Sequence, residues 1–76
     1  MRVRVRAEGG DGLTADLRLG AEGDGVTVTD WPRQLDADGR TSLLVPDDTL
    51  AGKAALLILA DATGKVVASR PTQIGG

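Results

Sequence analysis

The chain lacks cysteine, histidine, tyrosine and phenylalanine, and Trp31 is its single aromatic residue. Without cysteine there is no disulfide and no thiolate metal site. Without histidine, cysteine and tyrosine, the usual general bases and strong nucleophiles are missing, so we expect no enzymatic activity and no cofactor. The core must be built from valine, leucine, isoleucine and alanine, which bury less area per residue than aromatic side chains do.

Charge and hydropathy exclude further classes. The 9 basic and 11 acidic residues are interspersed, and no basic block or set of stacking aromatics predicts binding to nucleic acid. The longest apolar run, residues 54–60, is too short to span a bilayer. Residues 1–6 alternate arginine with valine, unlike a secretory signal, so we expect a cytoplasmic location and no membrane partner. Richness in alanine, glycine, aspartate, arginine and valine is typical of a bacterial genome rich in GC.

Glycine and acidic residues cluster at intervals that indicate turns. Residues 36–40 (DADGR) and 61–65 (DATGK) have nearly the same sequence, and glycine–acid segments also occupy 8–12 and 21–25. A leading aspartate can accept hydrogen bonds within such a turn, and the glycine permits a positive φ. We therefore expect both turns to be hairpin connections with a positive φ at Gly39 and Gly64, and the chain to consist mainly of short strands.

Alternating hydrophobicity locates the strands between these turns. Residues 2–7 alternate valine with arginine, and residues 13–19 alternate leucine or alanine with polar residues, which predicts a hairpin closed through residues 9–12. In that hairpin Asp16 would neutralise the arginines across the strand pair. Further strands are expected at 25–29, 41–45, 53–60 and 65–70. The prediction is a single all-β domain over residues 1–76: a small antiparallel β-sandwich or partly open barrel of six to seven short strands.

Two segments permit alternatives. Residues 46–49 could cap a helix at 49–62, which would make the fold α+β. Gly52 and the lack of a one-sided apolar stripe favour a loop or single helical turn at 46–52 and a strand at 53–60 instead. Residues 71–76 either pair as an edge strand or form a flexible tail.

The aliphatic strand carries the main functional hypothesis. Leu56 and Ile58 would occupy one face of this strand, and Leu57 and Leu59 the other. A chain this small cannot cover both faces, and exposed aliphatic patches usually mark contact surfaces. Trp31 is either a core plug or lid, which we favour, or an energetically important contact residue. These residues predict a non-catalytic interaction or assembly module, with a protein partner or a homo-oligomer as its complex.

Two charged motifs have alternative interpretations. Asp36-x-Asp38-Gly39 matches part of a calcium loop, but Gln34 and Val45 then occupy the first and last ligand positions, so turn formation explains it better. The stripe of Arg2, Arg4 and Arg6 could bind an acidic partner or phosphates. Acidic residues nearby favour a charged outer strand that discourages aggregation.

The segments 36–46, 52–54 and 61–67 resemble bacterial immunoglobulin-like and carboxypeptidase-regulatory-like sandwich modules. Those modules usually carry an aromatic residue after the glycine of the middle segment, where this chain has Ala54 and Ala55. The resemblance implies a non-catalytic adhesive or spacer module without a transferable active site.

The two ends of the chain resemble ubiquitin-like modifiers, which open with a β-hairpin and end in Gly-Gly, here Gly75 and Gly76. This resemblance implies conjugation through the terminal carboxylate. A β-grasp fold also needs a helix directly after the first hairpin, whereas residues 20–30 carry three glycines and a Val-Thr-Val-Thr run. The modifier is the alternative to the interaction module.

Overall fold

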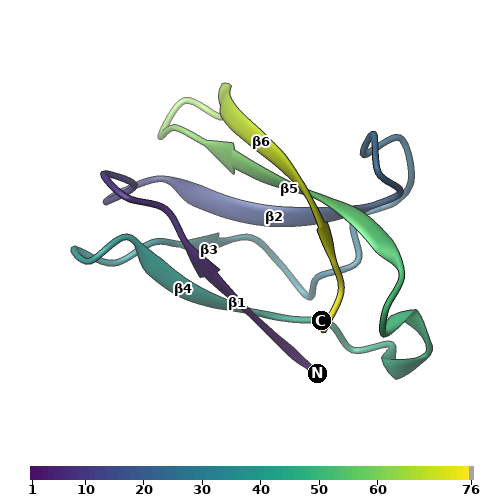
Figure 1. Ribbon diagram of the computed structural model, residues 1–76. Coiled ribbons are helices and arrows are strands. Elements are labelled where there is room, and N and C mark those ends of the chain that lie inside the picture. Colours follow the sequence, from purple (N-terminus) through teal and green to yellow (C-terminus); the bar gives the residue numbers. More distant parts are fainter. Residues whose placement is uncertain (76) are drawn as a thin grey trace.

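The computed structural model describes residues 1–75 as two antiparallel sheets (Figure 1). The smaller sheet pairs β1 (Arg2–Arg6) with β4 (Arg40–Leu44). The larger sheet has the order β3 (Arg33–Gln34), β2 (Thr14–Leu19), β5 (Ala54–Ala60) and β6 (Val66–Gln73). A short 3-10 helix, η1 (Asp48–Leu50), precedes β5. The predicted all-β sandwich is confirmed, and the sheets do not close into a barrel. The alternative helix at 49–62 is wrong, because residues 54–60 form a strand.

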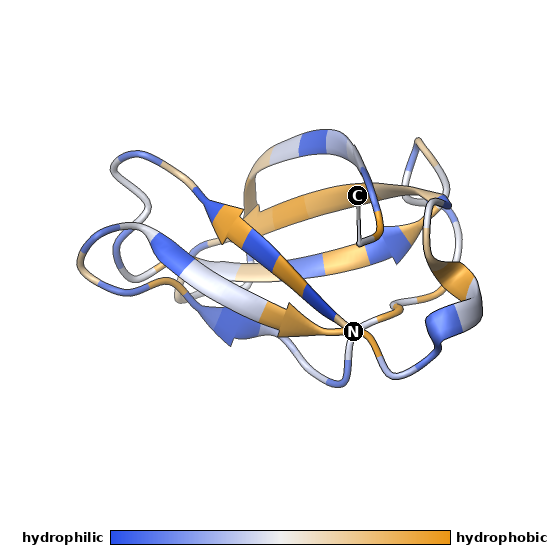
Figure 2. Ribbon diagram, turned by 60° about the horizontal axis from the view of Figure 1, so that its bottom comes forward, coloured by the Kyte–Doolittle hydropathy of each residue, from blue (hydrophilic) through white to orange (hydrophobic). Residues whose placement is uncertain are grey.

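The core lies between the two sheets and is entirely aliphatic. The buried side chains come from both sheets and from the loops beside them: Val5, Ala15, Leu17, Val28, Leu35, Leu43, Val45, Ala55, Leu57, Leu59 and Ile74. Alternate residues of β1 and β5 supply this core, as the alternation of hydrophobicity predicts. Figure 2 shows the alternation along β1 as orange and blue bands.

The predicted hairpin between residues 2–7 and 13–19 is wrong. β1 pairs with β4 and β2 pairs with β5, so the two strands belong to different sheets. Residues 7–13 form two successive turns, in which Gly10 donates to the Ala7 carbonyl at 2.9 Å and Leu13 donates to the Gly10 carbonyl at 3.0 Å. These turns carry the chain from one sheet to the other, and Asp16 is consequently not placed across from the arginines of β1.

Residues 25–35 run along the free edge of β2 without forming the strand predicted at 25–29. Leu19 donates to the Val26 carbonyl at 2.9 Å, and Val28 donates to the Leu17 carbonyl at 3.0 Å. The pairing between this segment and β2 is limited to an isolated bridge between Arg18 and Thr27. β3 then continues along the same edge of β2 for two residues. Farther on, Asp30 donates to the Leu44 carbonyl of β4 at 2.9 Å, which links the two sheets on this side.

The two matching turns form with the predicted local geometry, but only the turn at 61–65 connects a hairpin, and the hairpin predicted at 36–40 is wrong. Asp36 and Asp61 each accept hydrogen bonds through Oδ1 from the amides two and four residues later, at 2.9–3.1 Å. Gly39 and Gly64 have φ values of 73° and 86°. The Asp61 turn joins β5 to β6, whereas the Asp36 turn joins strands of different sheets. The same local sequence therefore serves two different connections.

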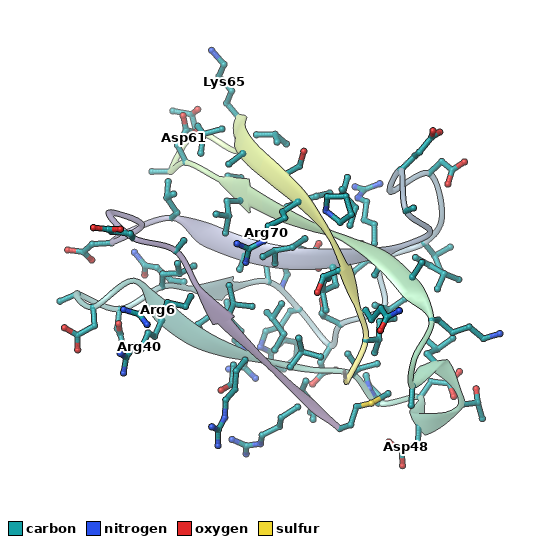
Figure 3. The ribbon with its side chains drawn as sticks, in the orientation of Figure 1. Arg6, Arg40, Asp48, Asp61, Lys65 and Arg70 are labelled. Atoms are coloured by element: carbon teal, nitrogen blue, oxygen red, sulfur yellow. The ribbon has the colours of Figure 1, made fainter. Side chains whose placement is uncertain are left out.

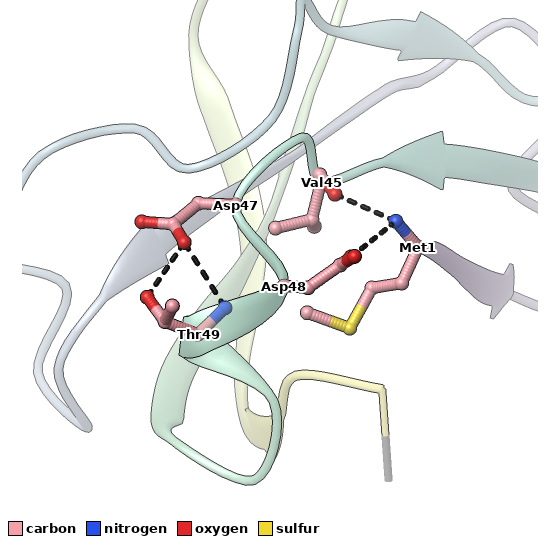
Figure 4. A network of polar contacts seen from close by, with 5 residues as sticks. All are labelled: Met1, Val45, Asp47, Asp48 and Thr49. Carbon is pink, nitrogen blue, oxygen red and sulfur yellow. Dashed lines mark hydrogen bonds and ion pairs between the residues drawn. The ribbon is translucent and has the colours of Figure 1, made fainter.

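The two ends of the described chain lie close together (Figure 1). The Met1 ammonium donates to the Val45 carbonyl at 2.7 Å and lies 3.3 Å from an oxygen of Asp48. Figure 4 shows this network beside the cap of η1, where Thr49 donates to Asp47. Residues 71–73 pair as part of β6, and Ile74 is fully buried. Within residues 1–75, no helix is long and apolar enough to cross a membrane.

Candidate functional site on the outer face of the larger sheet

β5 presents apolar side chains on both of its faces. Leu57 and Leu59 point into the core, and their exposed fractions are 5% and 9%. Leu56 and Ile58 alternate with them and are half-buried on the opposite, outer face of the sheet. The sequence therefore located two aliphatic faces correctly, and the structure identifies the outer one as the pair Leu56 and Ile58.

The neighbouring strands place a mixed set of side chains around this pair. On the β2 side, Arg18 lies across from Leu56 and Asp16 lies across from Ile58. On the β6 side, the corresponding partners are Pro71 and Ser69. Because directly opposed residues share a sheet face, an aliphatic row is flanked by charged residues on one side and by small or uncharged residues on the other.

The loop after β2 makes this face concave. A Cβ on Gly23 would lie 2.7 Å from Cδ2 of Leu56, so the loop backbone rests directly on the leucine side chain. Together with Pro32 it bounds a groove of about 630 Å³ whose floor is Leu56, Ile58 and Ala60. We call this the β5 groove. Neither Gly23 nor Pro32 was identified from the sequence, because their proximity to β5 depends on how the loop folds back.

Asp16 is one of three acidic residues that line the β5 groove, and its carboxylate accepts hydrogen bonds from β2 and from the segment that borders β2. The Thr29 hydroxyl donates to Asp16 Oδ1 at 2.6 Å, and the Leu17 amide donates to the same oxygen at 2.8 Å. The Thr27 hydroxyl approaches Oδ2 at 3.4 Å. Thr29 is buried, so these hydrogen bonds hold the Asp16 side chain in place. We therefore interpret Asp16 as a structural part of the groove wall.

Trp31 does not fill the core. Its side chain is 56% exposed, and the Arg33 guanidinium carbon lies 5.5 Å from the ring centroid, within the range of a cation–π contact. The favoured prediction of a core plug or lid is therefore wrong. Trp31 does not line the β5 groove either, although its neighbour Pro32 does. Four residues lie between Val26 and Trp31, and two of them, Val28 and Thr29, are buried where Trp31 is not.

Among residues 1–75, no three histidine, cysteine, aspartate or glutamate side chains gather as a metal site. Two exposed aspartates have a lowered pKa, Asp47 through its hydrogen bond from the Thr49 side chain and Asp61 through that from the Thr63 side chain. Both belong to turns, and these hydrogen bonds within the turns account for the shifts.

The fold and this face together define a small two-sheet β domain with a partly exposed aliphatic groove. No protein family, no characterised protein and no solved structure matches the chain. The functional argument consequently depends on the residues of the groove and on the edges of the sheets.

Proposed function

We propose that the chain is a non-catalytic assembly module that self-associates through the β5 groove. The observation that carries this proposal is the pair Leu56 and Ile58, which stays half-buried on the outer face while Leu57 and Leu59 complete the core. Completing the burial of two aliphatic side chains in each copy would be favourable, at about 25 cal/mol for each Å² of apolar surface removed from water.

Charge placement makes a second copy a suitable occupant. Arg18, Glu22 and Asp61 all lie around the rim of the β5 groove. A two-fold contact brings the same surface of both copies together, so Arg18 of one copy can face an acidic rim residue of the other. The aliphatic rows would then lie against each other at the centre of the contact.

The test compares charge insertions on the two faces of β5. Ile58→Glu should leave the domain folded but dissociated, because the new carboxylate lies on the outer face. Leu57→Glu should unfold it, because an unpaired carboxylate in the core costs several kcal/mol. Val67→Glu is the matched control, since Val67 is an exposed valine that does not line the groove. Light scattering measures particle mass, and circular dichroism measures folding.

A wild-type chain that remains monomeric at millimolar concentration would overturn self-association. Equal dissociation by Val67→Glu and Ile58→Glu would instead show that net charge, not the groove, controls assembly. The likeness to immunoglobulin-like modules also stays a prediction. It agrees with a non-catalytic role, but no observation supports it independently.

The ubiquitin-like alternative has no observation in its favour. The helix that a β-grasp fold places after its first hairpin does not occur within residues 1–75. Gly76 lies outside the described residues, and the adjoining Gly75 packs against the Met1 side chain. Deleting Gly76 separates the two functions, because a conjugated modifier would lose its activity whereas an assembly module would retain its particle mass.

A further inference from the structure

β1 is an edge strand whose free main-chain groups belong to its arginines. Met1 and Val45 exchange two hydrogen bonds, at 2.7 and 2.8 Å, and Ala7 donates to the Gly39 carbonyl at 2.8 Å. In an antiparallel ladder the residues bonded to the partner strand alternate with those that are not. The odd-numbered residues of β1 therefore bond to β4. The N–H and C=O groups of Arg2, Arg4 and Arg6 point away from β4, toward the open edge.

The same arginines place an excess of positive charge on the outer face of the smaller sheet. All three side chains are exposed, and Arg6 lies directly across from Arg40 (Figure 3). Like charges directly opposed on a sheet destabilise it. Among residues 1–75 the only ion pair joins the Met1 ammonium to Asp48, so none of these guanidinium groups has a carboxylate partner there. Asp16, the expected counter-charge, lies in the other sheet.

Beyond this edge, the inner face of β6 is uncovered. Ala68 and Arg70 lie across from Leu59 and Leu57, so they share the core-facing side of the larger sheet, yet both are exposed. The smaller sheet has two strands and the larger has four. The gap between β1 and β6 holds two hollows of about 280 and 370 Å³. The first contains parts of Leu57, Leu59 and Ala68, with Arg6 at one rim and Arg70 at the other (Figure 3).

β6 is the poorer of the two edges for adding a strand. Ile74 donates to the Lys53 carbonyl at 3.0 Å, so alternation directs the amides of Thr72 and Arg70 toward β5. The nitrogen of Pro71 then faces the open edge and offers no donor. Proline is tolerated in sheets at such edge positions. β1 has no proline and presents three consecutive donor and acceptor sites.

We propose that β1 accepts an added strand from a partner protein, and that this strand alternates acidic with aliphatic residues. Strand addition joins the main-chain groups of an extended segment to a free sheet edge, while side-chain pockets set the specificity. Alternate residues on a strand are about 6.8 Å apart. Acidic side chains at every second position would therefore lie beside Arg2, Arg4 and Arg6 on the outer face. The intervening aliphatic side chains would fill the gap over Leu57, Leu59 and Ala68.

A second copy of this chain is a poor occupant of that edge. Pairing β1 with β1 would set arginine against arginine on the outer face, which like-charge repulsion disfavours. The proposed partner is therefore a different protein, and its site is separate from the β5 groove on the opposite face of the larger sheet.

The probe for this proposal is a capped seven-residue peptide of alternating glutamate and valine, titrated into the full chain at low salt. Amide NMR shifts and hydrogen exchange should report binding at Arg2, Arg4 and Arg6. A peptide of the same composition with its glutamates grouped should bind at least tenfold more weakly. A peptide N-methylated at the amides that face β1 should also bind at least tenfold more weakly, because it has lost its donors.

Two variants of the chain complete the experiment. Arg4→Glu should weaken binding at least tenfold, whereas Lys65→Glu, which makes the same charge change at an exposed residue in the turn between β5 and β6, away from β1 (Figure 3), should leave it within about twofold. Strand addition would be overturned if N-methylation and residue order did not change the affinity of the peptide. It would also be overturned if a short oligothymidylate shifted the same residues, because β1 would then be a general anion-binding surface. No shift at Arg2, Arg4 or Arg6 at millimolar peptide would also overturn it. None of these outcomes depends on whether the chain self-associates.

Discussion

The carbonyl oxygen of Gly39 accepts a hydrogen bond from the Ala7 amide at 2.8 Å, and a Cβ on Gly39 would overlap the Ala7 carbonyl oxygen. The turn after β3 thus lies directly against the end of β1. Gly39 is needed for two reasons, its positive φ and this close approach of two backbones. Gly64 holds the equivalent position in the second turn, where a Cβ would meet no atom within 4 Å.

This difference predicts unequal effects of the same substitution. Gly64→Ala should lower the free energy of unfolding by about 1 kcal/mol, the cost of a positive φ in a residue with a Cβ. Gly39→Ala should cost clearly more, because the backbone of residue 7 must also move. Chemical denaturation of both variants measures the difference. Equal losses would show that the contact with Ala7 does not constrain the turn.

Adjacent leucines of β4 provide a test of the core. Leu43 is fully buried, whereas Leu44 is 37% exposed on the opposite face. Leu43→Ala should lower the free energy of unfolding by about 2–5 kcal/mol through lost burial and the cavity left behind. Leu44→Ala should cost about 1 kcal/mol or less. If the two losses were similar in urea denaturation, the assignment of the inner face of β4 would be wrong.

The Asp61 turn predicts a response to acid. The hydrogen bond from the Thr63 hydroxyl lowers the pKa of Asp61 in the folded chain. A depressed carboxyl pKa contributes stability above the pKa of the unfolded chain, and this contribution is lost as the pH falls through the folded value. Thr63→Val should raise the pKa of Asp61 toward its ordinary value, as measured by carbon NMR during an acid titration.

Asp47 supplies the internal control for that titration. The Thr49 side chain lowers its pKa in the same way, and Thr63→Val leaves this second turn intact. The pKa of Asp47 should therefore stay low in the variant. An unchanged pKa of Asp61 would assign the shift to the backbone amides of residues 63 and 65 instead.

Local patterns were sufficient to predict most elements of this fold, but not how they are joined. The Asp-Gly turns formed because their hydrogen bonds lie within five residues, and β5 formed because its aliphatic run is bounded by turns. The partner of β1 depends on contacts between residues nearly forty positions apart, which turn residues do not encode. The glycines at 9–12 fit a hairpin and a crossing between sheets equally well.

For the candidate sites as well, local patterns predicted which residues share a face of a strand, but not which residues from other segments lie beside them. Alternation placed Leu56 and Ile58 on one face of β5, and it placed Arg2, Arg4 and Arg6 on one face of β1. It gave no information on the loop carrying Gly23, on Arg40 lying across from Arg6, or on the exposure of Trp31. Those features depend on pairing across sheets and on the path of residues 20–35.

The position of Pro71 predicts that exchanging proline between neighbouring residues has opposite effects. Pro71→Ala should leave the free energy of unfolding within about 1 kcal/mol of wild type, because the new N–H faces the open edge, where water can accept its hydrogen bond. Thr72→Pro removes an amide that alternation directs toward β5, and leaving its acceptor unpaired should cost at least about 1–3 kcal/mol. Thermal and urea denaturation of both variants measures these losses. Thr72→Ala controls for loss of the threonine side chain. If Thr72→Pro were as stable as Thr72→Ala, the amide of Thr72 would not bond to β5, and the argument that Pro71 interrupts the open edge of β6 would be wrong.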